Sequence, residues 1–318
     1  MGDKRIQQKP PFIGAGWQAT LAPQRSRPHK IQGGQEVILQ ASSWASAQRA
    51  LDLILGCHRL VQGGPDVFDM DLIAYNEEEP EWMDEHERKL LREKAYGTTD
   101  FPLACAIAAK ASRRRKWVYA VAKYKFSLSL YSVHHMDLEP WHSPHLPISS
   151  FPRDHVTFSY SIISAYSVIE DLGLEVRASP EMPSRVKGVW NPVVKQDLEE
   201  RLLKDGVDLR ETFPWTVRGS KRKIEARRPV PTGSKAPWSA WIVRDSQIQV
   251  VDAIAYADWL RDRIASHGVK DLTGNLSPYD VVNVQHLARR LLLESLGFWR
   301  WWRRRGQPGP ADPPKLGD

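Results

Sequence analysis

The 318-residue sequence is 42% hydrophobic and 26% charged, which is the composition of a globular protein, and it has a formal net charge of +7. Because domains have roughly 100 to 200 residues, its length predicts two domains. It excludes a membrane-spanning protein, because no stretch approaches the roughly 18 consecutive apolar residues that a spanning helix needs. Two cysteines, Cys57 and Cys105, are too few for a disulfide framework or a thiolate zinc site, and residues 1–10 lack an apolar signal region, so we expect a cytoplasmic protein.

Residues 1–150 show a mixed pattern that predicts a smaller α/β domain without an assigned role. Alternating apolar residues between turn residues predict strands, and apolar residues at helical spacing predict a helix. The expected strands are residues 16–23, 36–42 and 66–76, and the expected helix is 43–64, closed by two glycines. In residues 102–136 the first part favours a helix, whereas the residues from Val118 alternate as in a strand. We predict a helix there.

Residues 151–299 have helical periodicity, after a proline-rich connection at 139–154. The pattern predicts four helices with start and stop signals. They are 162–172, with Ile162, Ala165, Tyr166 and Ile169 on one face; 191–206, with Pro192 near its start and Gly206 after its end; 241–266, with Val243, Val250, Ile254, Ala257, Arg261 and Ile264 on one face; and 277–299, with Ser277 as N-cap and Val284, Leu287, Ala288 and Leu291 buried. Residues 207–238, rich in Pro, Gly, Lys and Arg, predict a long basic loop. The fold class is therefore α+β, mainly α, with a C-terminal four-helix bundle.

The positive charge is concentrated in three clusters, at residues 113–116, 218–228 and 300–305. Clustered cations attract polyanions such as nucleic acid without reading their sequence, although any one cluster by itself is more typical of a solvated loop or tail. Residues 300–318 are expected to be a basic, disordered tail.

The segment at residues 260–268 brings an arginine and a histidine to the end of the third expected helix. Arg261 falls on the apolar face, where a guanidinium needs a charged acceptor. Asp262 points in a different direction, so a phosphate fits, and Gly268 can end the helix and turn His267 back toward Arg261. Proton transfer by a histidine and charge stabilisation by an arginine suffice for metal-independent cleavage of RNA through its 2′-hydroxyl. The plainer alternative is a basic helix end stabilised by the helix dipole.

This segment, LRDRIASHG, followed by SPYDVVNVQHLARRLLLESLGFW, resembles the HEPN superfamily over roughly residues 155–299. The family signature is an arginine, a polar residue directly after it, and a histidine a short spacer later. Arg261, Asp262 and His267 match these positions, with five residues between the arginine and the histidine. Asparagine is the commonest polar residue in the family, and Asp262 departs from it. The likeness is strongest to stand-alone members with an added N-terminal region, found beside bacterial defence systems.

The resemblance implies a homodimer in which both copies of the motif line one cleft of the helical bundle. It also implies a metal-independent endoribonuclease in which Arg261 stabilises the scissile phosphate, His267 transfers the proton and Asp262 orients one of them. We expect RNA as the partner, no cofactor, no membrane, an antitoxin or other regulatory partner, and a role in antiphage defence or a toxin system.

Other basic residues and two other functions complete the hypotheses. Further RNA contacts are expected from Arg263, His286, Arg289 and Arg290. An inactive module of the same fold would bind RNA or act as a scaffold. A metal-dependent hydrolase would use the cluster of His134, His135, His142 and His145, although the prolines beside them predict an irregular segment. The sequence has no Walker loop or dinucleotide fingerprint.

Overall fold

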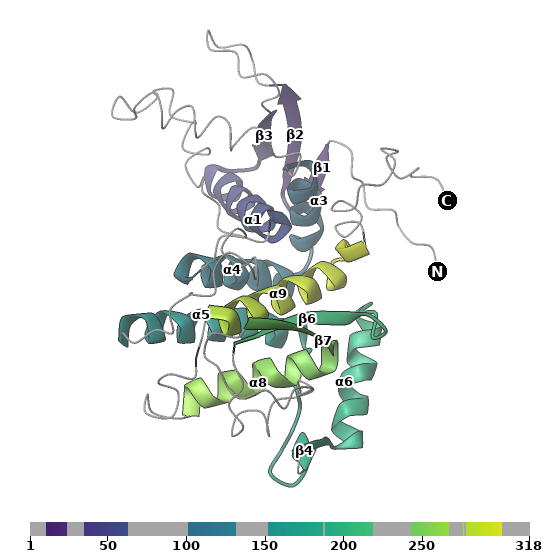
Figure 1. Ribbon diagram of the computed structural model, residues 1–318. Helices are drawn as coiled ribbons and strands as arrows, with labels where there is room; N and C mark the ends of the chain where they lie inside the picture. The colour runs from purple at the N-terminus through teal and green to yellow at the C-terminus, as the bar shows by residue number, and fades with distance from the viewer. Residues whose placement is uncertain are drawn as a thin grey trace. The chain divides into compact units, whose positions relative to one another are not determined.

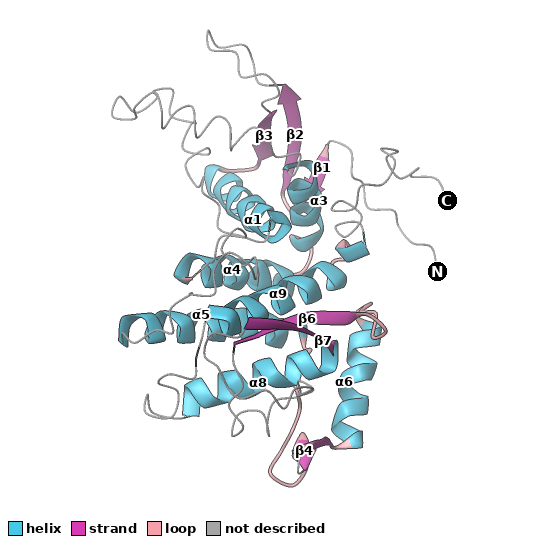
Figure 2. Cartoon of the chain, in the orientation of Figure 1, coloured by secondary structure: helices cyan, strands magenta, loops and turns pink. Residues whose placement is uncertain are grey.

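The computed structural model describes residues 11–23, 35–62, 101–131, 152–186, 188–218, 243–266, 276 and 278–300. The described residues form two compact units, one up to Val118 and the other from Tyr119 onwards. Both are built mainly from helices, with small antiparallel sheets, so the predicted class of α+β, mainly α, is confirmed at that level (Figures 1 and 2). The division falls within a helix, and residues 119–130, which we assigned to the N-terminal region, belong to the second unit.

The first unit packs two helices against a three-stranded antiparallel sheet in the order β1-β2-β3. Its elements are β1 (Phe12–Gly14), β2 (Trp17–Pro23), β3 (Gln35–Ala41), α1 (Trp44–Gln62) and α3 (Phe101–Ala111). The chain reverses between β1 and β2 at a position that only glycine fits, because a Cβ on Gly14 would lie 2.0 Å from the ring of Trp17. The strands predicted at 16–23 and 36–42 and the helix predicted at 43–64 are confirmed, and the strand expected at 66–76 lies outside the described residues.

The second unit is a helical assembly that carries two hairpins. Its helices are α4 (Arg115–Leu130), whose first turn lies in the other unit, α5 (Pro152–Leu172), α6 (Pro192–Lys204), α8 (Val250–Ser266) and α9 (Pro278–Ser295), and its strands are β4 (Arg185–Val186), β5 (Val189–Trp190), β6 (Thr212–Arg218) and β7 (Val243–Gln249). Helix α5 packs against both α8 and α9 (Figure 1). The predicted stripe of α9 is buried as expected, since Val284, Leu287, Ala288 and Leu291 are all 0% exposed. The prediction of a helix in residues 102–136 is also confirmed, as α3 and α4.

A buried polar cluster joins α4, α5 and α9. The hydroxyl groups of Ser127 and Ser161 each donate to the other residue's carbonyl oxygen, at 2.8 and 2.9 Å. Nε2 of Gln285 on α9 donates to both hydroxyl oxygens, at 3.1 and 3.0 Å. Because a buried polar group without a partner is costly, this exchange fixes where the three helices cross.

Two predicted elements are wrong where the chain forms a hairpin instead. Residues 212–218, predicted as loop, form β6, and the helix expected from residue 241 begins only at Val250, because residues 243–249 form β7. The two strands are antiparallel, with Phe213 opposite Ile248. Phe213, Trp215 and Ile248 are buried beside exposed neighbours. This period of two, which is typical of a strand with one buried face, overrides the helical spacing of Val243 and Val250.

The ends of α6 follow from local chemistry. Asn191 is the N-cap of α6, with its side-chain oxygen accepting from the backbone N–H of Val193 at 3.1 Å, and Pro192 follows it in the first turn. Gly206 ends the helix with a φ of +89°, where other residues are strained. The predicted start and stop of this helix are confirmed.

Candidate functional site

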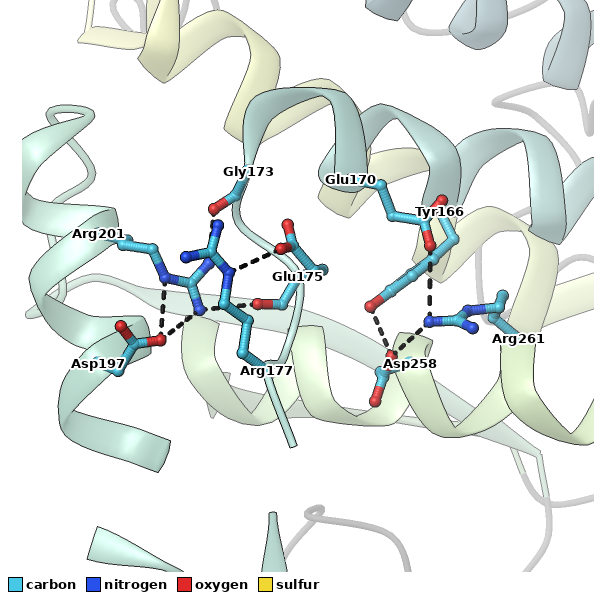
Figure 3. Close-up of polar contacts among 9 residues, drawn as sticks. All are labelled: Tyr166, Glu170, Gly173, Glu175, Arg177, Asp197, Arg201, Asp258 and Arg261. Carbon is cyan, nitrogen blue, oxygen red and sulfur yellow. Dashed lines mark hydrogen bonds and ion pairs between the residues drawn. The ribbon is translucent and has the colours of Figure 1, made fainter. Parts of the chain in front are cut away.

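The candidate site lies on the C-terminal half of α8, where it packs against α5. Arg261 is on the turn that follows Asp258, and Tyr166 and Glu170 approach it from α5 (Figure 3). The Arg261 side chain is 32% exposed, which agrees with the prediction that it lies at the apolar face rather than fully in solvent. Its guanidinium carbon is 5.0 Å from the centre of the Tyr166 ring, a cation–π contact.

Three carboxylates surround the Arg261 guanidinium. Nη2 is 3.2 Å from Oδ1 of Asp258 and 3.5 Å from Oε1 of Glu170, and Nη1 is 2.9 Å from Oδ1 of Asp262. The expectation that Asp262 does not accept from Arg261 is therefore wrong. Adjacent side chains leave a helix in different directions, but the long, flexible arginine side chain reaches back to the carboxylate. The guanidinium is engaged, so an incoming phosphate has to compete for it.

Asp258 and Tyr166 form the buried part of the site. The Tyr166 hydroxyl donates to Oδ1 of Asp258 at 2.6 Å. Burial raises the pKa of Asp258 to about 6, and the charge of Asp262 adds to the rise, while the Tyr166 hydrogen bond and Arg261 oppose it. Burial and the neighbouring Asp258 charge raise the pKa of Tyr166 far above its usual value, so it stays a donor. The carboxyl group of Asp258 consequently takes up its proton at a higher pH than an ordinary aspartate does.

Sequence reasoning missed Asp258, Tyr166 and Glu170 as members of the site. Asp258 precedes Arg261 by three residues, the spacing of helix neighbours, so the pattern contained this signal. Tyr166 was assigned to the apolar face of its helix, and its ring is indeed buried. Glu170 comes from another helix, and no sequence spacing reports that contact.

His267 and the side chain of Arg263 lie outside the described residues. The backbone of α8 ends at Ser266, directly before His267. The meeting of Arg261 and His267 therefore stays a prediction. The histidine cluster at 134, 135, 142 and 145 also lies outside the described residues. In the described part of the chain, no three His, Cys, Asp or Glu side chains are placed so that they could hold a metal ion together.

Arg289 and Arg290 contradict their predicted place on an RNA-binding surface. They are 5% and 2% exposed. Arg290 lies between Phe213 and Trp299, donates to the carbonyl oxygen of Thr212 at 3.1 Å and pairs with Glu294 at 3.2 Å. Their helix, α9, is covered by β6 and by neighbouring helices. The prediction failed because residues 212–218, which form β6, were expected to be a loop. His286, the third residue of that prediction on α9, is half-buried.

A second arginine cluster, at the C-terminal end of α5, has a structural role (Figure 3). Arg201 of α6 donates to the carbonyl oxygens of Gly173 and Glu175 at 2.5 and 2.9 Å and pairs with Asp197 at 2.8 Å. These carbonyls follow the last turn of α5, where a cation also interacts well with the helix dipole. The contacts hold α6 against the end of α5.

No protein-family model, curated protein or solved structure matches this chain. Among the described residues, no helix is long and apolar enough to cross a membrane.

Proposed function

We propose that this protein is a metal-independent endoribonuclease of the HEPN type that acts as a homodimer. One observation carries the proposal. Arg261 is a half-exposed cation in the last two turns of α8, in a mainly helical unit, and the chain places His267 just after the end of that helix. The surrounding Tyr166 and Asp258 fix the orientation of this guanidinium, as a group that binds a transition state requires.

The proposed reaction uses the ribose 2′-oxygen as nucleophile. The 2′-oxygen bonds to the adjacent phosphorus while the bond from phosphorus to the 5′-oxygen breaks, leaving a 2′,3′-cyclic phosphate and a 5′-hydroxyl. His267 takes the proton from the 2′-hydroxyl or gives one to the leaving 5′-oxygen, and Arg261 stabilises the extra negative charge on the phosphoryl oxygens. The second proton-transfer group is the His267 of the other subunit or Asp258, whose raised pKa suits it to this role.

Phosphate binding requires Arg261 to exchange some of its present partners. Asp262 and Glu170 are 58% and 41% exposed, so they lose little when they turn into solvent, because exposed ion pairs contribute only ~0–1 kcal/mol. Asp258 is 17% exposed and is held by Tyr166, so it stays in place as the group that orients Arg261. Asp262, the polar residue of the motif, then also competes with the phosphate for the Arg261 guanidinium.

The test is cleavage of total RNA by the purified chain in excess chelator. Wild type should produce fragments with 2′,3′-cyclic phosphate ends, and His267→Ala and Arg261→Ala should each remove the activity. Arg177→Ala is the matched control, since Arg177 is an exposed arginine of the same unit that pairs with Glu175. Retention of cleavage by His267→Ala would contradict the proposal, and cleavage that appears only when a divalent metal is added would favour the histidine cluster instead.

A non-catalytic scaffold is the second candidate, and the three carboxylates around Arg261 favour it. A guanidinium saturated by acids serves to pair α8 with α5, and such a protein would bind RNA or partners without cutting. The same experiment separates the two, because a scaffold gives no cleavage with wild type under any condition. A toxin or antiphage role, restrained by a regulatory partner, belongs to the first candidate.

A further inference from the structure

Helices α4 and α5 expose three large aromatic side chains. Tyr119 and Phe126 of α4 are 49% and 56% exposed, and Tyr160 of α5 is 59% exposed. Aromatic rings are usually among the more buried side chains of a domain, so three exposed rings on two paired helices indicate a surface that binds something.

The three rings lie on one side of the helix pair. Ser127 and Ser161 face each other across the pair, and Lys123 contacts Ser164 and Asp171, so the two helices run antiparallel. In an antiparallel pair, the residues directly before two facing residues project to the same side. Phe126 and Tyr160 are those residues.

The opposite side of the helix pair is buried. Leu128 and Ile162, the residues directly after the facing serines, are 4% and 0% exposed. Tyr119 precedes Phe126 by seven residues, or two turns, and so shares the exposed side. We call Tyr119, Phe126 and Tyr160 the aromatic face.

Helix α4 surrounds this face with positive charge. The helix contains four basic residues and no acidic residue. Lys125 adjoins Phe126 in the sequence. Lys123 also lies beside the aromatic face, where Asp171 neutralises it at 2.8 Å. Lysine is depleted in protein–protein interfaces, whereas cations interleaved with aromatic rings are the usual composition of a surface for single-stranded nucleic acid.

We propose that the aromatic face binds single-stranded RNA, with bases stacked on Phe126, Tyr160 and Tyr119 and with phosphates contacted by lysine side chains of α4. Stacking is independent of base identity, so the face holds RNA without reading its sequence. The choice of RNA rather than DNA rests on the proposed function. The stacking of bases on the aromatic face does not depend on the proposed function. It is a binding role separate from the proposed role of Arg261.

The test measures binding of the full chain to a fluorescein-labelled 2′-O-methyl oligouridine of about ten nucleotides by fluorescence anisotropy. This probe lacks the attacking hydroxyl, so binding is measured without cleavage. The double variant Phe126→Ala/Tyr160→Ala should bind at least about ten-fold more weakly, whereas Phe126→Tyr should keep the wild-type affinity because it keeps the ring. Trp44→Ala is the matched control, since Trp44 is an 80% exposed aromatic residue of the first unit.

The salt dependence of the affinity tests the contribution of α4 charge. Lys125→Ala should reduce the slope of log affinity against log salt by about 0.7, the value for one phosphate contact on a single strand, and Lys204→Ala on α6 should leave it unchanged. Circular dichroism and thermal midpoints equal to those of wild type establish that the variants fold.

Three results would overturn the proposal. They are equal affinity of the alanine double variant and wild type; dissociation of a homodimer by that variant, seen by light scattering, without a change in RNA affinity; and binding to phosphatidylserine vesicles but not to the oligonucleotide. Failure of the proposed nuclease activity is distinguishable from all three results. A chain that binds the probe through Phe126 and Tyr160 but cuts no RNA would contradict the nuclease proposal and support RNA binding by the aromatic face.

Discussion

Replacing Asp258 by asparagine tests the electrostatics of the candidate site through stability. The pKa of this carboxyl is raised from 3.8 to about 6 in the folded protein. The folded state therefore binds this proton more tightly than the unfolded state does. Its contribution to stability is fully present below about pH 3.8 and is lost as the pH rises through about 6. Two pKa units correspond to about 3 kcal/mol, so relative to Asp258→Asn the free energy of unfolding of wild type should fall by up to about 3 kcal/mol between about pH 4 and about pH 8.

Urea unfolding of both proteins across this pH range measures the difference, because titration of the other groups cancels between them. Tyr166→Phe provides an internal check. The Tyr166 hydrogen bond lowers the pKa of Asp258, so its removal should move the fall to higher pH. If the curves of wild type and Asp258→Asn run parallel from pH 4 to pH 8, Asp258 is ionised throughout and the reasoning about its burial is wrong.

Two further predictions concern packing elsewhere. Arg290→Leu should lower the free energy of unfolding by about 3–5 kcal/mol, because it leaves the buried Glu294 without its cation, and adding Glu294→Leu should restore part of the loss; equal stability of the single variant and wild type in urea would refute the role of the pair. Gly14→Ala should cost about 1–3 kcal/mol, because the added carbon meets the buried ring of Trp17, and an unchanged thermal midpoint would contradict this close approach.

Helix positions were predictable wherever the apolar spacing and the end signals agreed. In α9 the stripe from Val284 to Leu291 has the helical spacing and every member is buried. In α6 an asparagine, a proline and a later glycine mark both ends. These signals are local, because the interactions that stabilise the helix and its ends are made by residues close together in the sequence.

The β6–β7 hairpin was not predictable in the same way, because its stabilisation comes from partners far apart in sequence. Phe213 pairs with Ile248 across the two strands, and the ring centres of Trp215 and of Tyr256 on α8 are 4.9 Å apart. Residues 207–238 look like a loop by composition because almost half of them are charged residues or prolines. Phe213 and Trp215 decide the conformation of strand β6, because their side chains are buried and the strand packs against α8 and α9.

The roles of individual arginines depend on burial that the sequence does not express. Arg290 is 2% exposed. It donates to the carbonyl oxygen of Thr212 and pairs with Glu294, and these contacts join α9 to the start of β6. Arg201 is 15% exposed and caps the end of α5. Removing either one leaves buried acceptors unpaired, so neither can release its partners to bind a ligand. Arg261 differs because two of its three carboxylates are more than 40% exposed and regain water when they leave. Of these three cations, it alone can trade its present partners for a phosphate at small cost, which is the physical reason to place the chemistry there.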